Sequence, residues 1–415
     1  MQAIQRDASY WFRLFSPFIL CTVFAVPGVL VSLHAVHVAP VPAAALCGVA
    51  IVAAAFMLGW AGEAAELDLA GGLAVGLLAV VTILPEYVVS VYFSFAAGQD
   101  PSMVQYASAN VTGANRLLLG FGWPVVALIG FLALRSRARK ANTPKQKFGI
   151  VLEDESRTDL GFLVIASAIT LIIPVTGALH VLIGIVLVIL FALYLWRQSH
   201  AERDEPELEG TAALVGALPK VARRIFMIVV FLLAAGIILA NAEPFAHNLV
   251  EAGQVLGVDQ YLLVQWLAPL ASEAPEFALA IIFAAKGKAN MGLAILVSSK
   301  VNQWTALAGS LPIAYVVGGG SAAIPMDARQ VEEFMLTTAQ TLMGVALLLG
   351  LRLGARAATA LFVLFAIAFV NPDEHFRTIV AICYFVIAAV FVFIYRSKVK
   401  ETLAAPFRLP KRLSL

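Results

Sequence analysis

Long apolar runs separated by short polar segments dominate this chain. A helix that crosses a bilayer needs about 20 largely apolar residues. Two of the runs, 103–134 and 289–318, are longer than that and contain glycines, which predicts broken or strongly tilted helices. The pattern predicts an all-α polytopic membrane protein of about twelve spans, placed at 16–36, 42–61, 70–97, 103–134, 160–176, 178–196, 223–241, 258–285, 289–318, 331–351, 356–371 and 377–395.

The composition supports this interpretation and narrows the function. Of 415 residues, 61% are apolar and 13% are charged, which leaves too little polar surface for a soluble globule. The three cysteines have no metal or disulfide spacing. We find no nucleotide-binding, metalloprotease or nucleophile motif in a suitable context. We therefore expect no enzyme and no cofactor beyond transported cations, with the lipid bilayer as the surroundings.

The basic residues predict the orientation. With the N-terminus in the cytoplasm, all but four of the 28 lysines and arginines fall in cytoplasmic segments, as the positive-inside rule requires. Arg329 and Arg377 lie outside, and Arg116 and Lys300 lie at membrane depth. The basic residues thus follow topology and do not indicate nucleic-acid binding. We expect a multi-pass protein of the plasma or inner membrane with both termini in the cytoplasm.

Two similar segments divide the chain into halves. One reads VGLLAVVTILPEYVVSVYFSFAAG from Val75, and the other reads LVQWLAPLASEAPEFALAIIFAAKG from Leu263. Under the predicted topology the two Pro-Glu helices run in opposite directions, which predicts inverted repeats of about five helices each. The first half covers 1–196 with its repeat at about 75–135, a charged cytoplasmic linker covers 197–222, and the second half covers 223–415 with its repeat at about 263–318.

Each repeat places a glutamate directly after a proline in mid-helix. Pro85 and Pro275 each remove a backbone donor, and Glu86 and Glu276 follow them. A carboxylate at this depth costs at least about 2.5 kcal/mol, so two at matched positions call for a compensating cation. The alternative is that the glutamates pair with Arg116 and Lys300 as structural struts.

At these residues the sequence resembles the cation/calcium exchanger superfamily, whose repeats read roughly GTSxPE followed by GNxxGSNxxN. The resemblance implies ten helices in two inverted halves, so 16–36 and 377–395 would be extra helices. It also implies that Glu86 and Glu276 ligate the transported cation. By the same resemblance we expect further oxygen ligands at Thr82, Ser272, Asn110, Asn115, Ser299 and Gln303. Ser90 lies one helical turn after Glu86 on the same face, where its hydroxyl can also reach the site. Oxygen ligands suit hard cations such as Ca²⁺ or Na⁺.

The second repeat departs from the family pattern in its charges. Lys300 stands where the pattern has an asparagine, and Glu273 stands where it has a serine. A lysine ammonium can occupy the place of a cation and can give up its proton. Lys300 therefore either replaces a bound cation, takes part in proton coupling, or pairs with Glu273 to hold the helices together.

The function expected from these features is secondary antiport of inorganic cations by alternating access, of the Ca²⁺/H⁺ or Na⁺/Ca²⁺ type. The alternatives are a Na⁺/H⁺ antiporter in which Lys300 replaces a cation, a passive cation channel and, least favoured, an intramembrane enzyme. The sequence leaves the cation pair and the oligomeric state open.

Overall fold

The computed structural model describes residues 7–68, 84–140, 148–200, 208–371 and 373–408. Thr82 therefore lies outside the described residues. The chain divides into two compact units, and each takes segments from both halves of the sequence. The first unit is Met1–Tyr92, Leu195–Pro275 and Pro410–Leu415, and the second is Phe93–Tyr194 and Glu276–Leu409.

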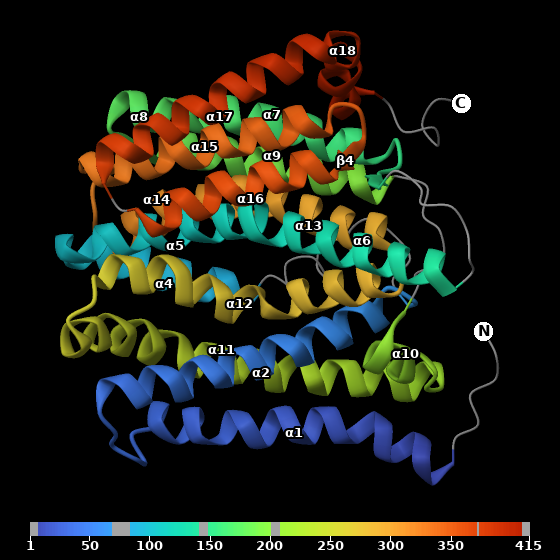
Figure 1. The fold of residues 1–415 in the computed structure, drawn as a ribbon. Helices are drawn as coiled ribbons and strands as arrows, with labels where there is room; N and C mark the ends of the chain where they lie inside the picture. Colours follow the sequence, from blue (N-terminus) through green and yellow to red (C-terminus); the bar gives the residue numbers. More distant parts are fainter. Residues whose placement is uncertain (1–6, 69–83, 141–147, 201–207, 372, 409–415) are drawn as a thin grey trace. The chain divides into compact units, whose positions relative to one another are not determined.

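In the first unit, α1, α2 and α11 pack side by side (Figure 1). The close approach of α1 requires Gly28, because a Cβ there would lie 2.6 Å from the carbonyl oxygen of Leu46. Ser32 on α1 donates to Asn241 Oδ1 on α11 at 2.8 Å. The described helices of this unit, two of which continue past its boundary, are α1 (Ala8–Ser32), α2 (Pro40–Ala65), α4 (Leu84–Gln99), α10 (Gly210–Gly216), α11 (Lys220–Leu256) and α12 (Gln260–Ala285).

Helix α11 is longer than the apolar run that predicted it. The prediction ended at 241 because polar residues follow, but polarity alone does not interrupt helical hydrogen bonds. The helix continues to Leu256 and ends at Gly257, whose φ of 65° suits a left-handed C-cap. At its start Arg223 Nε contacts Asp68 Oδ2 at 2.6 Å, and this guanidinium holds the pKa of Asp68 below its ordinary value.

The second unit holds most of the remaining helices. Asp327 and Asp373 begin α15 and α17 by accepting from the backbone N–H groups of Gln330 and Phe376, each at 2.8 Å. The helices are α5 (Val104–Leu117), α6 (Trp123–Lys140), α7 (Ser156–Thr170), α8 (Ile172–Thr176), α9 (Val181–Ser199), α13 (Ala289–Asn302), α14 (Ala308–Val317), α15 (Ala328–Leu348), α16 (Ala355–Val370), α17 (Glu374–Ile394) and α18 (Arg396–Ala404), with 3₁₀ turns η1 (Pro101–Met103) and η4 (Ala405–Phe407).

Two short β-ribbons in the second unit add to the predicted helices. Strand β1 (Gly149–Val151) pairs antiparallel with β4 (Arg352–Gly354), and β2 (Ala178–His180) pairs antiparallel with β3 (Ala323–Pro325). Each ribbon joins a connection of the first sequence half to one of the second. The predicted topology puts β1 and β4 on the cytoplasmic side and β2 and β3 on the outer side, so each observed pair is consistent with it.

The two overlong runs are continuous helices with a wide turn rather than breaks. The π-helical turn η2 (Leu118–Gly122) joins α5 to α6, and η3 (Gln303–Leu307) joins α13 to α14. π-Helical turns are rare and occur frequently at functional sites. Both turns lie in the second unit.

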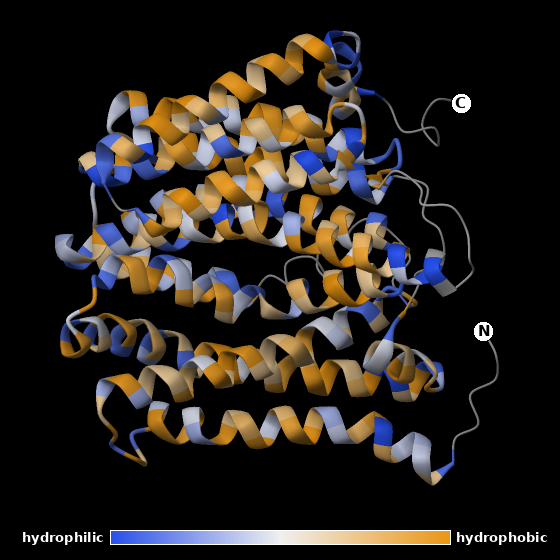
Figure 2. Cartoon of the chain, viewed as in Figure 1, coloured by the Kyte–Doolittle hydropathy of each residue, from blue (hydrophilic) through white to orange (hydrophobic). Residues whose placement is uncertain are grey.

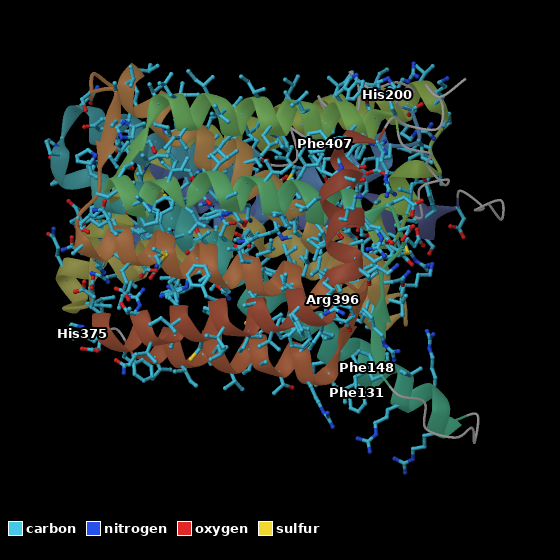
Figure 3. All side chains as sticks on the ribbon, turned by 90° about the horizontal axis from the view of Figure 1, so that it is seen from above. Phe131, Phe148, His200, His375, Arg396 and Phe407 are labelled. Carbon is cyan, nitrogen blue, oxygen red and sulfur yellow. The ribbon has the colours of Figure 1, made fainter. Side chains whose placement is uncertain are left out.

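Eight helices of the described residues are long and apolar enough to cross a membrane. Figure 2 shows apolar residues along their middles and hydrophilic residues near many of their ends. In Figure 3, His375 and Arg396 mark opposite ends of α17. Every predicted span falls on a described helix, although 70–97 is described only from Leu84 onward. The chain is therefore a polytopic, nearly all-helical protein, and the total of twelve spans stays a prediction.

Candidate functional site

The predicted cation ligands are distributed over the two compact units. Glu86, Ser90, Ser272 and Glu273 belong to the first. The second contains Asn110, Asn115, Glu276, Ser299, Lys300 and Gln303. Both Pro-Glu helices, α4 and α12, contain a boundary between the units, and in α12 the boundary falls between Pro275 and Glu276.

In the first unit the candidate carboxylates are buried. Glu86 is 5% exposed and Glu273 is 2% exposed. Ser90 lies one turn after Glu86 on α4 and is fully buried. The hydroxyl of Ser272 donates to carbonyl oxygens of its own helix, on Ala268 and Pro269, at 3.2 Å each. These side chains supply carboxylate and hydroxyl oxygens in an apolar setting.

In the second unit, Glu276 is held by the neighbouring helix of its own repeat. Ser299 on α13 donates to Glu276 Oε2 on α12. Both residues are partly buried. A hydroxyl that donates to a carboxylate favours its ionised form and fixes its orientation. The structure thus brings together two residues that the family resemblance had assigned to the same cation.

Lys300 meets the first repeat in the second unit. Its Nζ donates to the side-chain oxygen of Asn115 at 2.7 Å and to the backbone oxygen of Asn115 at 3.0 Å. The same Nζ lies 5.1 Å from the centroid of the Trp304 ring, within the range of a cation–π interaction. Lys300 and Asn115 are both 0% exposed. The ammonium therefore occupies a position that two oxygen ligands define.

Arg116 belongs to a buried ion cluster that the sequence reasoning missed. Its NH1 contacts Glu333 Oε2 at 2.5 Å, and Arg377 binds the other oxygen of Glu333. Arg377 Nε also lies 3.6 Å from Glu332 Oε1. Arg116, Glu333 and Arg377 are at most 3% exposed. Arg116 therefore has a carboxylate partner outside the repeats, Glu333 on α15, which the strut interpretation did not include.

A sequence signal for this cluster existed. Glu332 and Glu333 are adjacent carboxylates at the start of the apolar run predicted as the span 331–351. Two intramembrane carboxylates require partners. Arg377 was predicted outside the membrane, yet it is 3% exposed and lies in α17. Arg116 comes from α5 of the first repeat, and Arg377 comes from α17, the predicted extra helix. Spacing in the sequence does not reveal that these two helices supply the partners of the carboxylates.

The remaining candidates lie on the two helical segments that contain the π-helical turns. Gln303 begins η3 and is 0% exposed, and Asn110 is 2% exposed on α5. The backbone oxygen of Arg116 accepts from the side chain of Gln340 at 3.4 Å. A change from i+4 to i+5 hydrogen bonding leaves nearby carbonyls open to side-chain donors. Lys300 and Gln340 both use carbonyl oxygens just before η2.

The donor set around these residues is rich in oxygen. Among the described residues, no cluster of three or more histidine, cysteine, aspartate or glutamate side chains could hold a metal ion. The oxygens of Glu276, Ser299 and Asn115 are of the kind that hard cations prefer as ligands.

Comparisons with known proteins agree with this chemistry. The family model described as sodium/calcium exchanger protein matches residues 40–199 and 226–397. The chain is 35% identical to a crystal structure of the H⁺/Ca²⁺ exchanger CAX, with a TM-score of 0.88 over 97% of this chain and 98% of that one. The Ca²⁺/H⁺ antiporter protein YfkE is 18% identical, with a TM-score of 0.60 over 84% of this chain and 98% of that one, which is a likeness of fold. No curated protein matches the chain.

Proposed function

The chain belongs to the sodium/calcium exchanger protein family, and from this premise we propose that it is a secondary antiporter that exchanges Ca²⁺ for protons or for Na⁺. Members of this family are secondary transporters and not enzymes. The 35% identity to an H⁺/Ca²⁺ exchanger over nearly the whole of both chains favours protons as the counter-ion.

In this proposal Glu86 and Glu276 carry the exchange. Each glutamate holds part of a dehydrated cation or carries a proton, and the two kinds of ion therefore compete for the same oxygens. Alternating access exposes the loaded glutamates first to one side of the membrane and then to the other. Because one carboxylate pair serves both ions in turn, neither ion crosses without the other.

The observation that carries the proposal is the contact between Ser299 and Glu276. It joins the two helices of the second repeat at the residues assigned to a cation. Ser299 orients the carboxylate of Glu276. The proposed oxygen ligands from the two repeats are completed by Glu86, Ser90, Thr82, Ser272, Asn110 and Gln303. Glu273 adds negative charge that a divalent cation would balance.

The π-helical turns support an inverted-repeat architecture. When the two repeats are aligned on GSNxxN, Asn115 corresponds to Lys300 and Leu118 corresponds to Gln303. The turns η2 and η3 begin at Leu118 and Gln303 and have equal length. The contact between Asn115 and Lys300 then joins corresponding positions of the two repeats. The paired strands likewise agree with a topology that puts both termini in the cytoplasm.

A second candidate function, Na⁺/H⁺ antiport, is favoured by the contacts of Lys300. Its ammonium donates to two oxygens of Asn115, which are atoms that could also coordinate a monovalent cation. In this version Lys300 replaces one bound cation and the glutamates exchange Na⁺ for protons. The two candidates differ in whether Ca²⁺ or Na⁺ moves against the proton gradient.

The test is ion movement in sealed proteoliposomes that contain the purified protein. An imposed pH gradient should drive Ca²⁺ uptake with opposite proton flux, and collapse of the gradient by a protonophore with clamped voltage should stop it. Na⁺ uptake without Ca²⁺ uptake would select the Na⁺/H⁺ antiporter. Current that follows the gradient of one ion without a counter-ion would show a passive channel and overturn the proposal.

A further inference from the structure

One buried side chain on α12 has no role in the site described above. Gln265 is 0% exposed, and among the residues that the structure describes no group hydrogen-bonds with either its amide oxygen or its amide nitrogen. Buried polar groups without partners are rare, and inside a membrane no bulk water compensates them. An unpaired buried amide therefore indicates a polar occupant that comes and goes.

The backbone adds a second open oxygen at the same residue. In an α-helix the carbonyl of Gln265 accepts from the N–H of the residue four positions later, which is Pro269 and has no N–H. Pro275 removes the corresponding donor for the carbonyl of Ala271. Two prolines in one helix thus free two carbonyl oxygens about 1.7 turns apart, and inside a membrane a free carbonyl is tolerated where protein or water reaches it.

The helical register relates these oxygens to the candidate site. Ser272 follows Gln265 by seven residues in the same unit, so a regular helix places the two within about 20° of one face. The rise of an α-helix separates Gln265 from Ser272 by about 10 Å. The buried carboxyl group of Glu273 lies farther along α12 in the same unit, so the field along this part of the helix attracts cations rather than anions.

From these observations we propose that Gln265 is an entry position for the transported cation. Its amide and backbone oxygens hold a partly hydrated Ca²⁺ before the ion passes along α12 to Ser272. The inference rests on the proposed function. In the predicted topology α12 runs from the outer to the cytoplasmic side, and Gln265 lies near its N-terminal, outer end. Gln265 therefore serves ions that enter from outside.

The decisive experiment combines transport from each side with thermal stability. Gln265→Met keeps the size of the side chain and removes its oxygen. It should raise the KM for Ca²⁺ presented outside by about tenfold, which corresponds to the loss of one polar contact, and should leave the KM from the cytoplasmic side unchanged. The Tm should stay equal or rise, because an unpaired amide has been removed. Vesicles sorted by the side on which an N-terminal tag is accessible separate the two orientations.

A matched control is Thr402→Val. Thr402 is 1% exposed, and its hydroxyl also has no hydrogen-bond partner among the described residues. It lies in α18, away from both repeats. This variant should raise the Tm in the same way and leave both KM values unchanged.

Pro269→Ala provides a second variant if Gln265→Met does not fold. Alanine supplies the missing N–H and improves helix propensity, so the protein should remain folded while the carbonyl of Gln265 becomes occupied. The outer KM should again rise. If both variants keep the wild-type KM from outside, or if only the cytoplasmic KM changes, the inference is wrong. In that case the wild-type protein still exchanges cations, whereas failure of the proposed function would abolish exchange in the wild type itself.

Discussion

The second helices of the two repeats share a backbone design and differ in their charges. In both, polar residues precede a π-helical turn, at Leu118 in the first repeat and at Gln303 in the second. The first repeat places the neutral Asn115 where the second places Lys300. The buried cation of the first repeat is Arg116, whose guanidinium contacts Glu333 of α15.

This difference assigns a structural role to Arg116 and a role near the candidate ligands to Lys300. The guanidinium of Arg116 is neutralised by a carboxylate outside the repeats, so it adds rigidity without adding charge to the cation ligands. The ammonium of Lys300 instead donates to two oxygens of Asn115, a candidate ligand of the first repeat. One buried cation therefore holds the fold together, and the other is placed to influence which ions bind.

The largest effect should come from Glu333→Gln. This change removes the carboxylate that Arg116 and Arg377 both contact, and leaves the two guanidinium groups buried. Removal of one partner of a buried ion pair typically lowers the free energy of unfolding by about 3–5 kcal/mol. Thermal unfolding in detergent should show the loss. The matched control is Asp154→Asn, because the side chain of Asp154 is 82% exposed where it meets Arg157, and exposed pairs contribute less than about 1 kcal/mol. Equal losses in the two variants would contradict a scaffold role for the cluster.

Ser299→Ala should have the next largest effect, and on transport rather than on folding. It removes the hydroxyl that donates to Glu276, and a hydrogen bond to a charged group contributes about 1.5–3 kcal/mol. The apparent affinity for Ca²⁺ should fall by about tenfold to a hundredfold in vesicle uptake. Ser310→Ala is the control, because among the contacts described the hydroxyl of Ser310 donates only to the backbone oxygen of Leu307, one turn earlier in the same helical segment. A wild-type affinity in Ser299→Ala would remove Ser299 from the site.

Lys300→Ala should change ion preference more than rate. Without the ammonium, the oxygens of Asn115 can receive Na⁺, so the apparent affinity for Na⁺ should rise by about tenfold. The pH dependence of exchange should also weaken. Lys300→Arg keeps the positive charge and should keep Na⁺ excluded, which makes it the matched control. Wild-type pH dependence and Na⁺ sensitivity in Lys300→Ala would mean that Lys300 only holds helices together.

The smallest effect is expected from Ala114→Ser, which gives the first repeat the hydroxyl that the second has at Ser299. Ala114 is fully buried on α5. Because the new hydroxyl can bond to a carbonyl of its own helix, the affinity for Ca²⁺ should change by less than about threefold. A tenfold gain in vesicle uptake would show that the first repeat can accept the same contact, and the asymmetry of the repeats would then be weaker than proposed.

The helices were predictable because the bilayer requires long apolar runs, and each predicted span lies on a described helix. The end of α11 could not be predicted in the same way, because the continuous apolar run ends near Ala242 whereas the helix continues to Leu256. The β-ribbons were also missed. Three-residue strands are too short for a recognisable alternation, and their partners lie far away in sequence.

The candidate site was predictable where a repeat or a family pattern marked it. The spacing of Ser299 from Glu276 anticipated their contact. Arg116 and Glu333 are 217 residues apart, and no repeat relates them. The position of the Lys300 ammonium against Asn115 was also out of reach, because it depends on how two repeat helices pack rather than on either sequence alone.

The central claim is that both repeat glutamates carry the exchanged ions. The most direct measurement is Ca²⁺ uptake driven by a pH gradient in proteoliposomes containing wild type, Glu86→Gln or Glu276→Gln, with folding checked by gel filtration. Each substitution removes one of the two proposed carboxylates while keeping the side-chain shape, and exchange should fall by at least about a hundredfold, corresponding to roughly 2.7 kcal/mol. Wild-type exchange by either folded variant would contradict the claim.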